Sequence, residues 1–503
     1  MKDARIRALC DLMVPTAREA CGLHDYDGVV QDLSPDGVRR GLAAIGGPPG
    51  TPPLEDAHDE AHLRAFESSA HVVYGELELH RRNPLFHVSN LDLACYDREY
   101  GPAEEREAAR RAHLAAWPEA IEASIRALDA VPAPIARATI GAARGLAAGL
   151  HPERDAAALA AHARLVAHLE TAMTTGDPSA ALGGEALASL IGSAEAMEVD
   201  LTDLAARADS ERDRLRAMLA EACERITPGQ LPSLTVTALL ADHPDADGVI
   251  TEATALTDEV RAWTREHELV PYDDGECLVG PAPESRQWAM AMMAWAAPYE
   301  PDGPSWYHVT PPHPSWPPAD QEEWLQVFSR TTLPAITVHE VAPGHYSHSR
   351  ALRNAPTPVR RILMSDAFIE GWAHYVEEVA VEEGFRASDP RFAAGVALEA
   401  LVRVTRLACA IGLHTGSMTV EDAARRFTED AFLHGPAALS EARRGTFDPT
   451  YGRYTWGKLV LLGVRDQARA AWGGGFSLPR FHRALLDLGS PPLGLLGTAV
   501  TRG

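Results

Sequence analysis

The sequence predicts a mainly α-helical protein with a small antiparallel β element. Along most of the 503 residues, alanine-rich segments place apolar side chains three and four positions apart, which is the spacing of one helix face. Residues 271–318 instead contain many prolines and short apolar or alternating runs, which are typical of short strands and turns. We therefore expect helices on both sides of one short β segment.

Composition and charge restrict the possible partners. The formal net charge of −25 repels phosphate backbones and anionic lipids, so nucleic-acid and membrane partners are disfavoured. The N-terminal segment has no signal-peptide core, and no apolar run reaches the roughly 18 residues that a membrane span needs. Six cysteines lie far apart without a C-x-x-C pair, which favours reduced thiols. We predict a soluble cytoplasmic protein; its oligomeric state stays open.

Helices and breaks alternate before the β segment. The periodicity is strongest at 160–174 and 195–226. Glycine- and proline-rich stretches interrupt the helices at 46–53, 130–136, 174–184 and 227–232. Each break is too short to tether separate domains, so we expect one domain over residues 1–503.

Two or three short strands are expected in the proline-rich stretch, around 277–280, 288–296 and 305–310. We interpret this stretch as the rim of a cleft; a surface loop with an incidental hairpin is the alternative. Helices resume after it and continue to the end of the chain.

The segment from 331 to 383 has the highest density of reactive side chains, and we expect two zinc-site helices at about 333–383. Metallopeptidases with an H-E-x-x-H motif place two histidines four residues apart on one helix, so that both bind one Zn²⁺. Here His339 and Glu340 are followed by Pro343, and the next histidine is His345. Pro343 and Gly344 should make the helix bulge, which would return His345 to the side of His339. His348 remains a competing ligand.

The second zinc-site helix should begin near Ser365 and Asp366, which favour helix N-termini. Glu370, His374 and Glu377 fall on one face of it. Apolar neighbours suggest that Glu370 is buried, and a buried carboxylate requires a cation or a metal.

These side chains predict a catalytic zinc site. His339, His345 and Glu370 would supply three ligands and leave room for water. Glu340 would act as the general base, and His374 or Glu377 would orient a ligand from behind. The chemistry of such a site is metal-assisted hydrolysis.

At these residues the chain resembles the bacterial domain-of-unknown-function 885 family. The family signatures H-E-x-x-P-G-H and E-G-W-x-x-Y-x-E occur here as HEVAPGH (339–345) and EGWAHYVE (370–377). Further likeness appears in HRRNPLFH (80–87), YTWGKL (454–459) and FHRALLDLGSPPLGLL (481–496). The family usually has an aspartate four residues before His414, where this chain has Ala410, so the role of His414 is open.

That family is in turn similar to helical zinc peptidases of the carboxypeptidase Taq type. The resemblance implies a metallopeptidase-like body of two helical lobes with a long central cleft. It also implies a zinc-dependent carboxypeptidase- or oligopeptidase-like enzyme that acts on a peptide or small amide. Whether it cuts at an end or within the chain is not implied.

Two tyrosines near the C-terminus are candidates for stabilising a developing oxyanion. A phenol stays protonated at neutral pH and donates one directed hydrogen bond. Tyr454 is preferred to Tyr451 because it matches a Y-x-x-G pattern of the family. Three arginines are candidates for binding a substrate carboxylate, although acidic residues offer each of them an ordinary partner: Arg403, Arg406 and Arg453.

Two other classes of function compete with a hydrolase. One is a helical binding protein on a peptidase scaffold that has lost catalysis, although all the expected zinc-site residues are present. The other is a di-iron helical bundle, which needs Glu-x-x-His on two helices. Glu370 and His374 are four residues apart, and no second copy occurs.

Overall fold

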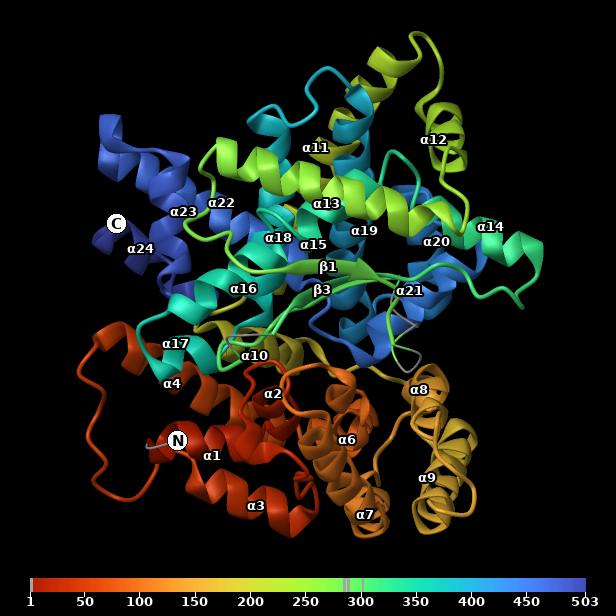
Figure 1. Cartoon of the computed structure of the whole chain (residues 1–503), viewed down its shortest axis with the longest axis vertical. Helices are drawn as coiled ribbons and strands as arrows, with labels where there is room; N and C mark the ends of the chain where they lie inside the picture. The colour runs from red at the N-terminus through yellow and green to blue at the C-terminus, as the bar shows by residue number, and fades with distance from the viewer. Residues whose placement is uncertain (1–2, 284–285, 287–289, 301–302) are drawn as a thin grey trace.

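The computed structural model of the protein describes residues 3–283, 286, 290–300 and 303–503. It is mainly helical, which confirms the predicted class (Figure 1). The helices before the β segment are α1 Ala4–Asp11, α2 Val14–Arg18, α3 Pro35–Ala44, α4 Ala57–Ala70, α5 Leu79–Arg82, α6 Leu85–Leu91, α7 Ala103–Ala127, α8 Ala133–Gly145, α9 Ala156–Thr175, α10 Gly184–Glu195, α11 Leu201–Ile226, α12 Pro232–Ala241 and α13 Gly248–Glu266. Short 3-10 or π turns span His24–Tyr26, His71–Glu76 and Ala94–Asp97.

The helices after the β segment carry the candidate site. They are α14 Pro318–Val327, α15 Leu333–Glu340, α16 His345–Asn354, α17 Pro358–Ile362, α18 Asp366–Glu382, α19 Pro390–Thr415, α20 Val420–Ala431, α21 Gly435–Phe447, α22 Arg453–Trp472, α23 Leu478–Leu486 and α24 Gly497–Arg502. Two 3-10 turns lie at Gly473–Gly475 and Leu493–Leu495.

The predicted helix boundaries are mostly local in origin. The segment 160–174 lies within α9, and the expected breaks fall at the ends of helices. The segment 195–226 is not one helix, because α10 ends at Glu195 and Ala196 adopts a left-handed conformation with φ 51°. Asp200 then caps α11 by accepting from the backbone N–H groups of Thr202 and Asp203. The helix therefore starts at Leu201.

The β segment forms three strands in the order β1-β3-β2, and this sheet is mixed. β2 Ala291–Ala294 pairs antiparallel with β3 Ser305–Val309, whereas β1 Cys277–Gly280 pairs parallel with β3. The prediction of a purely antiparallel element was therefore wrong. A β2–β3 hairpin occupies one side of β3, and β1 adds to the other side in the same chain direction. Residues 288–289 of the second expected strand lie outside the described residues.

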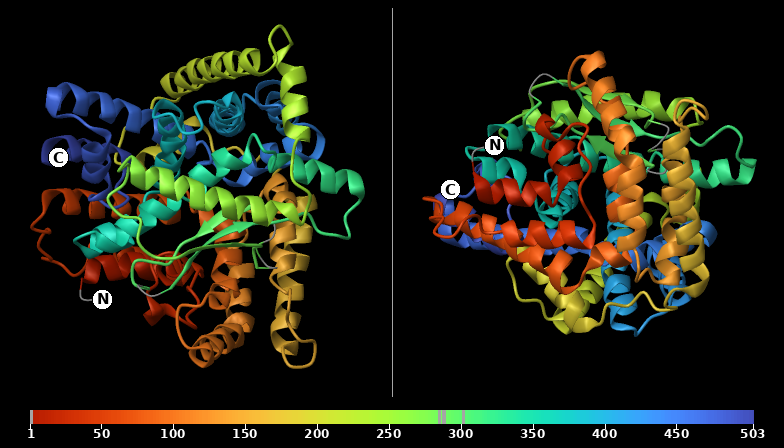
Figure 2. Two further views of the ribbon diagram at one scale, coloured as in Figure 1. Left: turned by 45° about the horizontal axis from the view of Figure 1, so that its top comes forward. Right: turned by 90° about the horizontal axis from the view of Figure 1, so that it is seen from below.

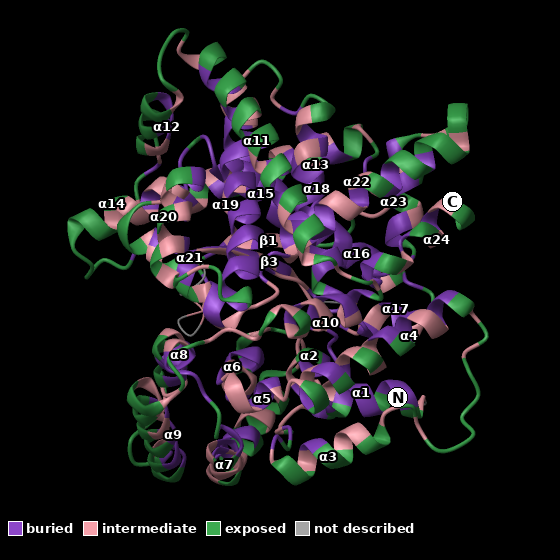
Figure 3. Ribbon diagram, turned by 180° about the vertical axis from the view of Figure 1, so that it is seen from behind, coloured by how far each residue is buried: buried purple, intermediate pink, exposed green. Residues whose placement is uncertain are grey.

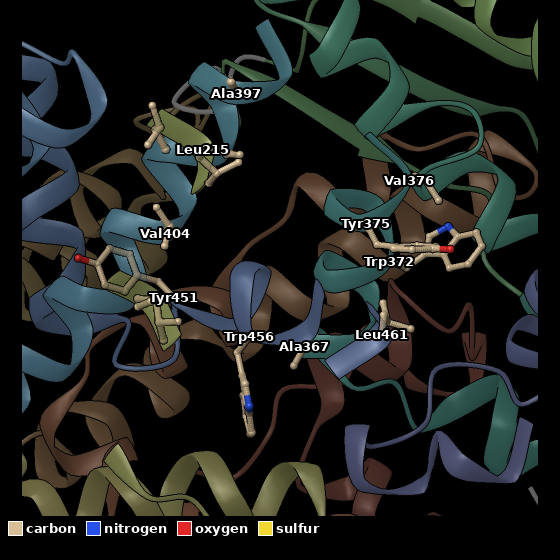
Figure 4. Packing of buried hydrophobic residues seen from close by; sticks show 14 of the residues in the cluster. Leu215, Ala367, Trp372, Tyr375, Val376, Ala397, Val404, Tyr451, Trp456 and Leu461 are labelled. Atoms are coloured by element: carbon tan, nitrogen blue, oxygen red, sulfur yellow. The ribbon is translucent and has the colours of Figure 1, made fainter. Parts of the chain in front are cut away.

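Helices α1 to α9 gather at one end of the molecule, and the sheet lies beside α13 nearer its middle (Figure 1). The long helices α7 and α9, orange and gold, pack side by side in both views of Figure 2. Of the four hydrophobic clusters, one lies within α6–α9 and the residues between them, and another joins the first helices to α17. The other two join α10–α13 to the sheet and the later helices. Figure 4 shows part of the largest cluster, including Trp372 of α18 and Leu461 of α22.

Helix α15 lies at the centre of the later elements and is buried along its whole length (Figure 3). It packs against α13, α18, α19 and β2. A helix that is covered on all sides shows no amphipathic pattern, so its polar residues must find partners inside the protein. His339 and Glu340 lie at its C-terminal end.

Two expectations about the chain as a whole can be compared with the described part. All six cysteines are free thiols, as predicted, and five of them are buried. None of the helices in the described ranges has the length and apolar character needed to cross a bilayer.

Candidate metal centre

The chain turns sharply between the two histidines of the HEVAPGH segment. A single bulged helix was expected, but α15 ends at Glu340 and α16 begins at His345. The connecting residues contain a cis Ala342–Pro343 peptide bond. Only glycine fits at position 344, because a Cβ there would lie 1.8 Å from the carbonyl oxygen of His339. The prediction of a bulge was wrong in form, but the turn brings the two histidines together as expected.

The turn is also attached to α18. The indole Nε1 of Trp372 donates to the carbonyl oxygen of Pro343 at 2.9 Å. Helix α18 begins as predicted, because the Ser365 hydroxyl accepts from the backbone N–H of Phe368. Trp372 is two residues from Glu370, so one helix both supplies a candidate ligand and fixes the turn that carries the others.

Three donor side chains converge at this point. Nε2 of His339 and Nε2 of His345 each lie 3.4 Å from Oε2 of Glu370. The two imidazole rings are 4.7 Å apart and nearly perpendicular. Zinc–ligand bonds of about 2.0–2.1 Å in a tetrahedron place neighbouring ligand atoms roughly 3.4 Å apart. The two measured distances match that value.

Two polar atoms of this group lack hydrogen-bond partners. Oε2 of Glu370 and Nδ1 of His345 are buried and have no hydrogen-bond partner among the described residues. Both histidines are buried, whereas the Glu370 side chain is 20% exposed. An unsatisfied buried carboxylate oxygen is costly unless a cation binds it. The three residues therefore fit a metal ion that is reached from one side.

Electrostatics keep Glu370 ionised. Burial by itself raises the pKa of a carboxyl group, but His339 and His345 more than offset this and hold the pKa of Glu370 well below its ordinary value. Burial and Arg403 lower the pKa of His339, but Glu370 and Glu377 outweigh them, so that this pKa is raised to about 9. The surroundings thus favour a positive charge between the imidazoles and the Glu370 carboxylate.

Glu377 lies behind His339 and fixes its orientation. His339 Nδ1 is 2.5 Å from Oε1 of Glu377, so the opposite nitrogen faces Glu370. Glu377 also accepts from Arg403 Nη1 at 2.9 Å, and His374 Nδ1 lies 3.3 Å from it. Of the two residues expected to orient a ligand, Glu377 contacts His339 directly, and His374 contacts Glu377. Burial raises the pKa of Glu377, but Arg403 and His374 outweigh it and hold that pKa below its ordinary value.

Glu340 is buried at the end of α15, next to His339 in the chain. Its carboxylate forms no hydrogen bond or ion pair with other described residues. Its charge acts on Tyr307 of β3, whose pKa is raised mainly by burial and also by the Glu340 carboxylate. A carboxylate without a partner is free to accept a proton.

The two candidate tyrosines have different surroundings. The ring of Tyr454 stacks on His339 with the ring centres 6.3 Å apart, and its hydroxyl has no hydrogen-bond partner among the described residues. Burial and the Glu370 carboxylate raise the pKa of Tyr454, so its phenol stays protonated. Tyr451 is fully buried in the largest hydrophobic cluster (Figure 4). The structure therefore brings Tyr454, and not Tyr451, to the donor group.

Two further histidines lie elsewhere. His348 is fully buried, its Nε2 is 2.9 Å from the Ser490 hydroxyl, and burial lowers its pKa to about 3. His414 is buried with Nε2 2.8 Å from the carbonyl oxygen of Gly445. Both therefore serve the core, and the structure favours His345 as the second ligand.

Sequence reasoning did not identify Trp295 as a neighbour of the group. It follows β2, and its ring lies 6.4 Å from that of His345. No spacing rule connects residues 50 positions apart on different elements. Of the two cavities described, one is lined by Tyr26 and Tyr299 and the other by Thr251 and Arg330. Neither includes a residue of the donor group, so neither corresponds to the expected long cleft. The cleft stays a prediction.

The comparisons with known proteins agree with a shared fold. A "putative lipoprotein of unknown function" from Shewanella oneidensis has a TM-score of 0.78 and 19% identity, covering 99% of this chain and 98% of that one. A "putative lipoprotein" from Colwellia psychrerythraea has a TM-score of 0.77 and 17% identity, covering 99% and 97%. The chain has no match among curated proteins. Residues 15–500 match the profile described as bacterial protein of unknown function (DUF885), and the chain therefore belongs to the DUF885 family.

Proposed function

We propose that the protein is a zinc-dependent hydrolase, and specifically a metallopeptidase that cleaves peptides or small amides. One observation carries the proposal: Nε2 of His339 and Nε2 of His345 each lie 3.4 Å from the same oxygen of Glu370. Catalytic zinc sites commonly use three such protein ligands and keep a fourth position for water or substrate. Zinc bound by these residues would lower the pKa of water and polarise an amide carbonyl.

Glu340 acts as the general base in this proposal. Its carboxylate is buried next to His339 and has no partner in the described part of the chain, so it can take a proton from the attacking water. The same oxygen then delivers the proton to the leaving nitrogen. Loss of a general base typically slows a reaction by about 10²–10⁴-fold.

Tyr454 donates a hydrogen bond to the oxyanion that develops from the substrate carbonyl. Its ring stacks on His339, and burial keeps the phenol protonated. Glu377 holds His339 in the orientation that the reaction requires. These roles require a substrate-binding cleft between two helical lobes, which we infer as the arrangement of a carboxypeptidase-like body.

The test begins with elemental analysis of protein purified in metal-free buffer. We expect one zinc per chain, and cleavage of a mixture of short peptides followed by mass spectrometry. Glu340→Gln should keep zinc and lose cleavage, while Glu383→Gln, an exposed residue of the α18 C-terminus, should behave as wild type. Zinc without cleavage of any peptide would favour the non-catalytic binding protein, iron would favour another metalloenzyme, and protein without metal would contradict the proposal.

A further inference from the structure

Several guanidinium groups surround the ring of Tyr454. The guanidinium carbons lie 5.2 Å (Arg406), 5.6 Å (Arg453) and 6.0 Å (Arg403) from the ring centre. They come from α19 and from the start of α22. Because the same ring stacks on His339, these cations lie next to the candidate zinc site.

Each of these arginines forms an ion pair with at least one carboxylate. Arg403 interacts with Glu377 and Glu399. A further arginine, Arg444 of α21, lies 6.0 Å from the ring centre of Tyr451. Arg406, Arg444 and Arg453 are called here the arginine cluster. Its ion-pair partners are two carboxylates, Glu441 and Asp448.

Arg406 forms a two-point contact with Glu441 at 2.7 and 2.8 Å, while Arg444 and Arg453 share Asp448. Asp366 acts on Arg453 only electrostatically and is exposed. Counted with Arg403 and its partners, four guanidinium groups lie within ion-pair distance of four carboxylates, so the charges balance.

Some donors of the cluster are unused. Nε of Arg453 is buried without a hydrogen-bond partner in the described ranges. Nη1 of Arg406 and Nη1 of Arg444 also donate to none of the described residues. The side chains are 14% (Arg406), 16% (Arg453) and 30% (Arg444) exposed, so solvent and ligands reach them. Guanidinium donors in partly buried surroundings bind carboxylates strongly.

We propose that the arginine cluster binds the C-terminal carboxylate of the substrate, so that the enzyme removes residues from the C-terminal end of peptides. This inference rests on the proposed hydrolase function. Each extended residue spans about 3.3–3.6 Å. The two distances that join His339 to Arg406 through the Tyr454 ring, 6.3 and 5.2 Å, correspond to at most two or three residues. Cleavage is therefore expected one to three residues from the C-terminus.

The test compares N-acetyl-trialanine with its C-terminal amide, which differ only in the terminal charge. Binding is measured by calorimetry on zinc-loaded Glu340→Gln protein, in which the peptides are not cut, and cleavage is measured on wild type. We expect the acid to bind about 10–100-fold more tightly than the amide, as for a charge-assisted hydrogen bond. Wild type should also cleave the acid with a correspondingly higher kcat/KM.

Three substitutions in the Glu340→Gln background locate the effect. Arg444→Gln leaves Asp448 paired with Arg453 and should reduce the preference to less than threefold. Glu441→Gln removes the ion-pair partner of Arg406 and should increase the preference for the acid over the amide. Arg443→Gln, on the exposed side of the same helix, should leave it unchanged and is the matched control.

The outcomes separate the two proposals. Equal binding of acid and amide, no binding of either at millimolar concentration, or a preference that survives Arg444→Gln would overturn the carboxylate site. Equal cleavage of both peptides by wild type would leave the hydrolase and remove the C-terminal selectivity. Preferential binding of the acid without cleavage of either peptide would keep the carboxylate site and contradict the hydrolase.

Discussion

Gly371 of α18 and Gly457 of α22 are in direct contact where the two helices cross. A Cβ on Gly371 would lie 2.6 Å from the Cα of Gly457, which is closer than two carbon atoms can approach. Gly371 follows Glu370, and Gly457 lies three residues after Tyr454. The crossing therefore sets the distance between a candidate metal ligand and the candidate oxyanion donor.

We expect Gly371→Ala to destabilise the protein, because the added methyl group must push two helix backbones apart. Overpacking of this kind typically costs about 1–3 kcal/mol. The matched control is Gly463→Ala in α22, where an added Cβ would meet no atom within 4 Å. That substitution should stabilise the protein by about 0.5–1 kcal/mol, as alanine is the better helix former. Urea unfolding measures both; an unchanged midpoint for Gly371→Ala would show that the crossing tolerates a side chain.

Glu370→Ala should remove the metal, whereas His348→Ala should keep it. Glu370 lies 3.4 Å from both histidine nitrogens, but His348 contacts Ser490 in the core. Zinc content after dialysis, measured by elemental analysis, distinguishes the two. His348→Ala is expected to lower thermal stability only. The ligand assignment is wrong if the Glu370 variant retains full zinc occupancy while the His348 variant loses it.

Glu377→Gln should weaken zinc binding by about 10–100-fold, the usual effect of losing the group that orients a histidine ligand. The amide cannot provide the same ionised partner to Nδ1 of His339 and to Arg403. Competition with a zinc chelator of known affinity gives the dissociation constant. Glu383→Gln, exposed at the end of the same helix, is the control. Equal affinities of the two variants would assign Glu377 to folding alone.

Tyr454→Phe should lower kcat by about 10²–10³-fold, the usual loss for one oxyanion donor. Zinc content and folding should not change, because the hydroxyl has no hydrogen-bond partner among the residues described. Tyr451→Phe is the matched control, since that hydroxyl is buried without a partner in the core. Steady-state kinetics on a cleaved peptide provide the measurement. If only the Tyr451 variant loses activity, the donor is the other tyrosine; if neither does, this segment is structural.

The buried carboxyl group of Glu195 should make stability depend on pH. Burial raises its pKa to about 7, although the Leu493 N–H and the Ser365 hydroxyl partly oppose this. Because the folded-state pKa lies above the unfolded value near 4.5, the contribution of Glu195 is fully present below about pH 4.5. It is lost as the pH rises toward 7.

The free energy of unfolding of Glu195→Gln, relative to wild type, should therefore be about 1–3 kcal/mol higher at pH 8 than at pH 5. Urea unfolding at the two pH values measures this difference, in which other titrating groups cancel. Glu185→Gln, exposed on the same helix, should show no such change. A difference for Glu195→Gln that is independent of pH would mean that its carboxyl group is ionised throughout this range.

Local features of the sequence determined the fold class, most helix boundaries and the candidate ligands. Apolar spacing reports which side of a helix is buried, and a cap such as Ser365 acts within its own helix turn. The same reasoning identified His339, Glu340 and Glu370, because a donor pattern on one helix face depends only on nearby residues.

The tertiary structure decided how distant segments meet. Packing between elements determines that β1 pairs parallel with β3. It also determines that His345, and not His348, lies at the donor group, and that Tyr454, and not Tyr451, stacks on His339. Which of two nearby candidates reaches the site depends on the direction in which its side chain leaves the turn or helix. Contacts such as Trp372 with Pro343 and Gly371 with Gly457 fix the position of that turn or helix. These contacts join residues 29 or more positions apart, so no local spacing could specify them.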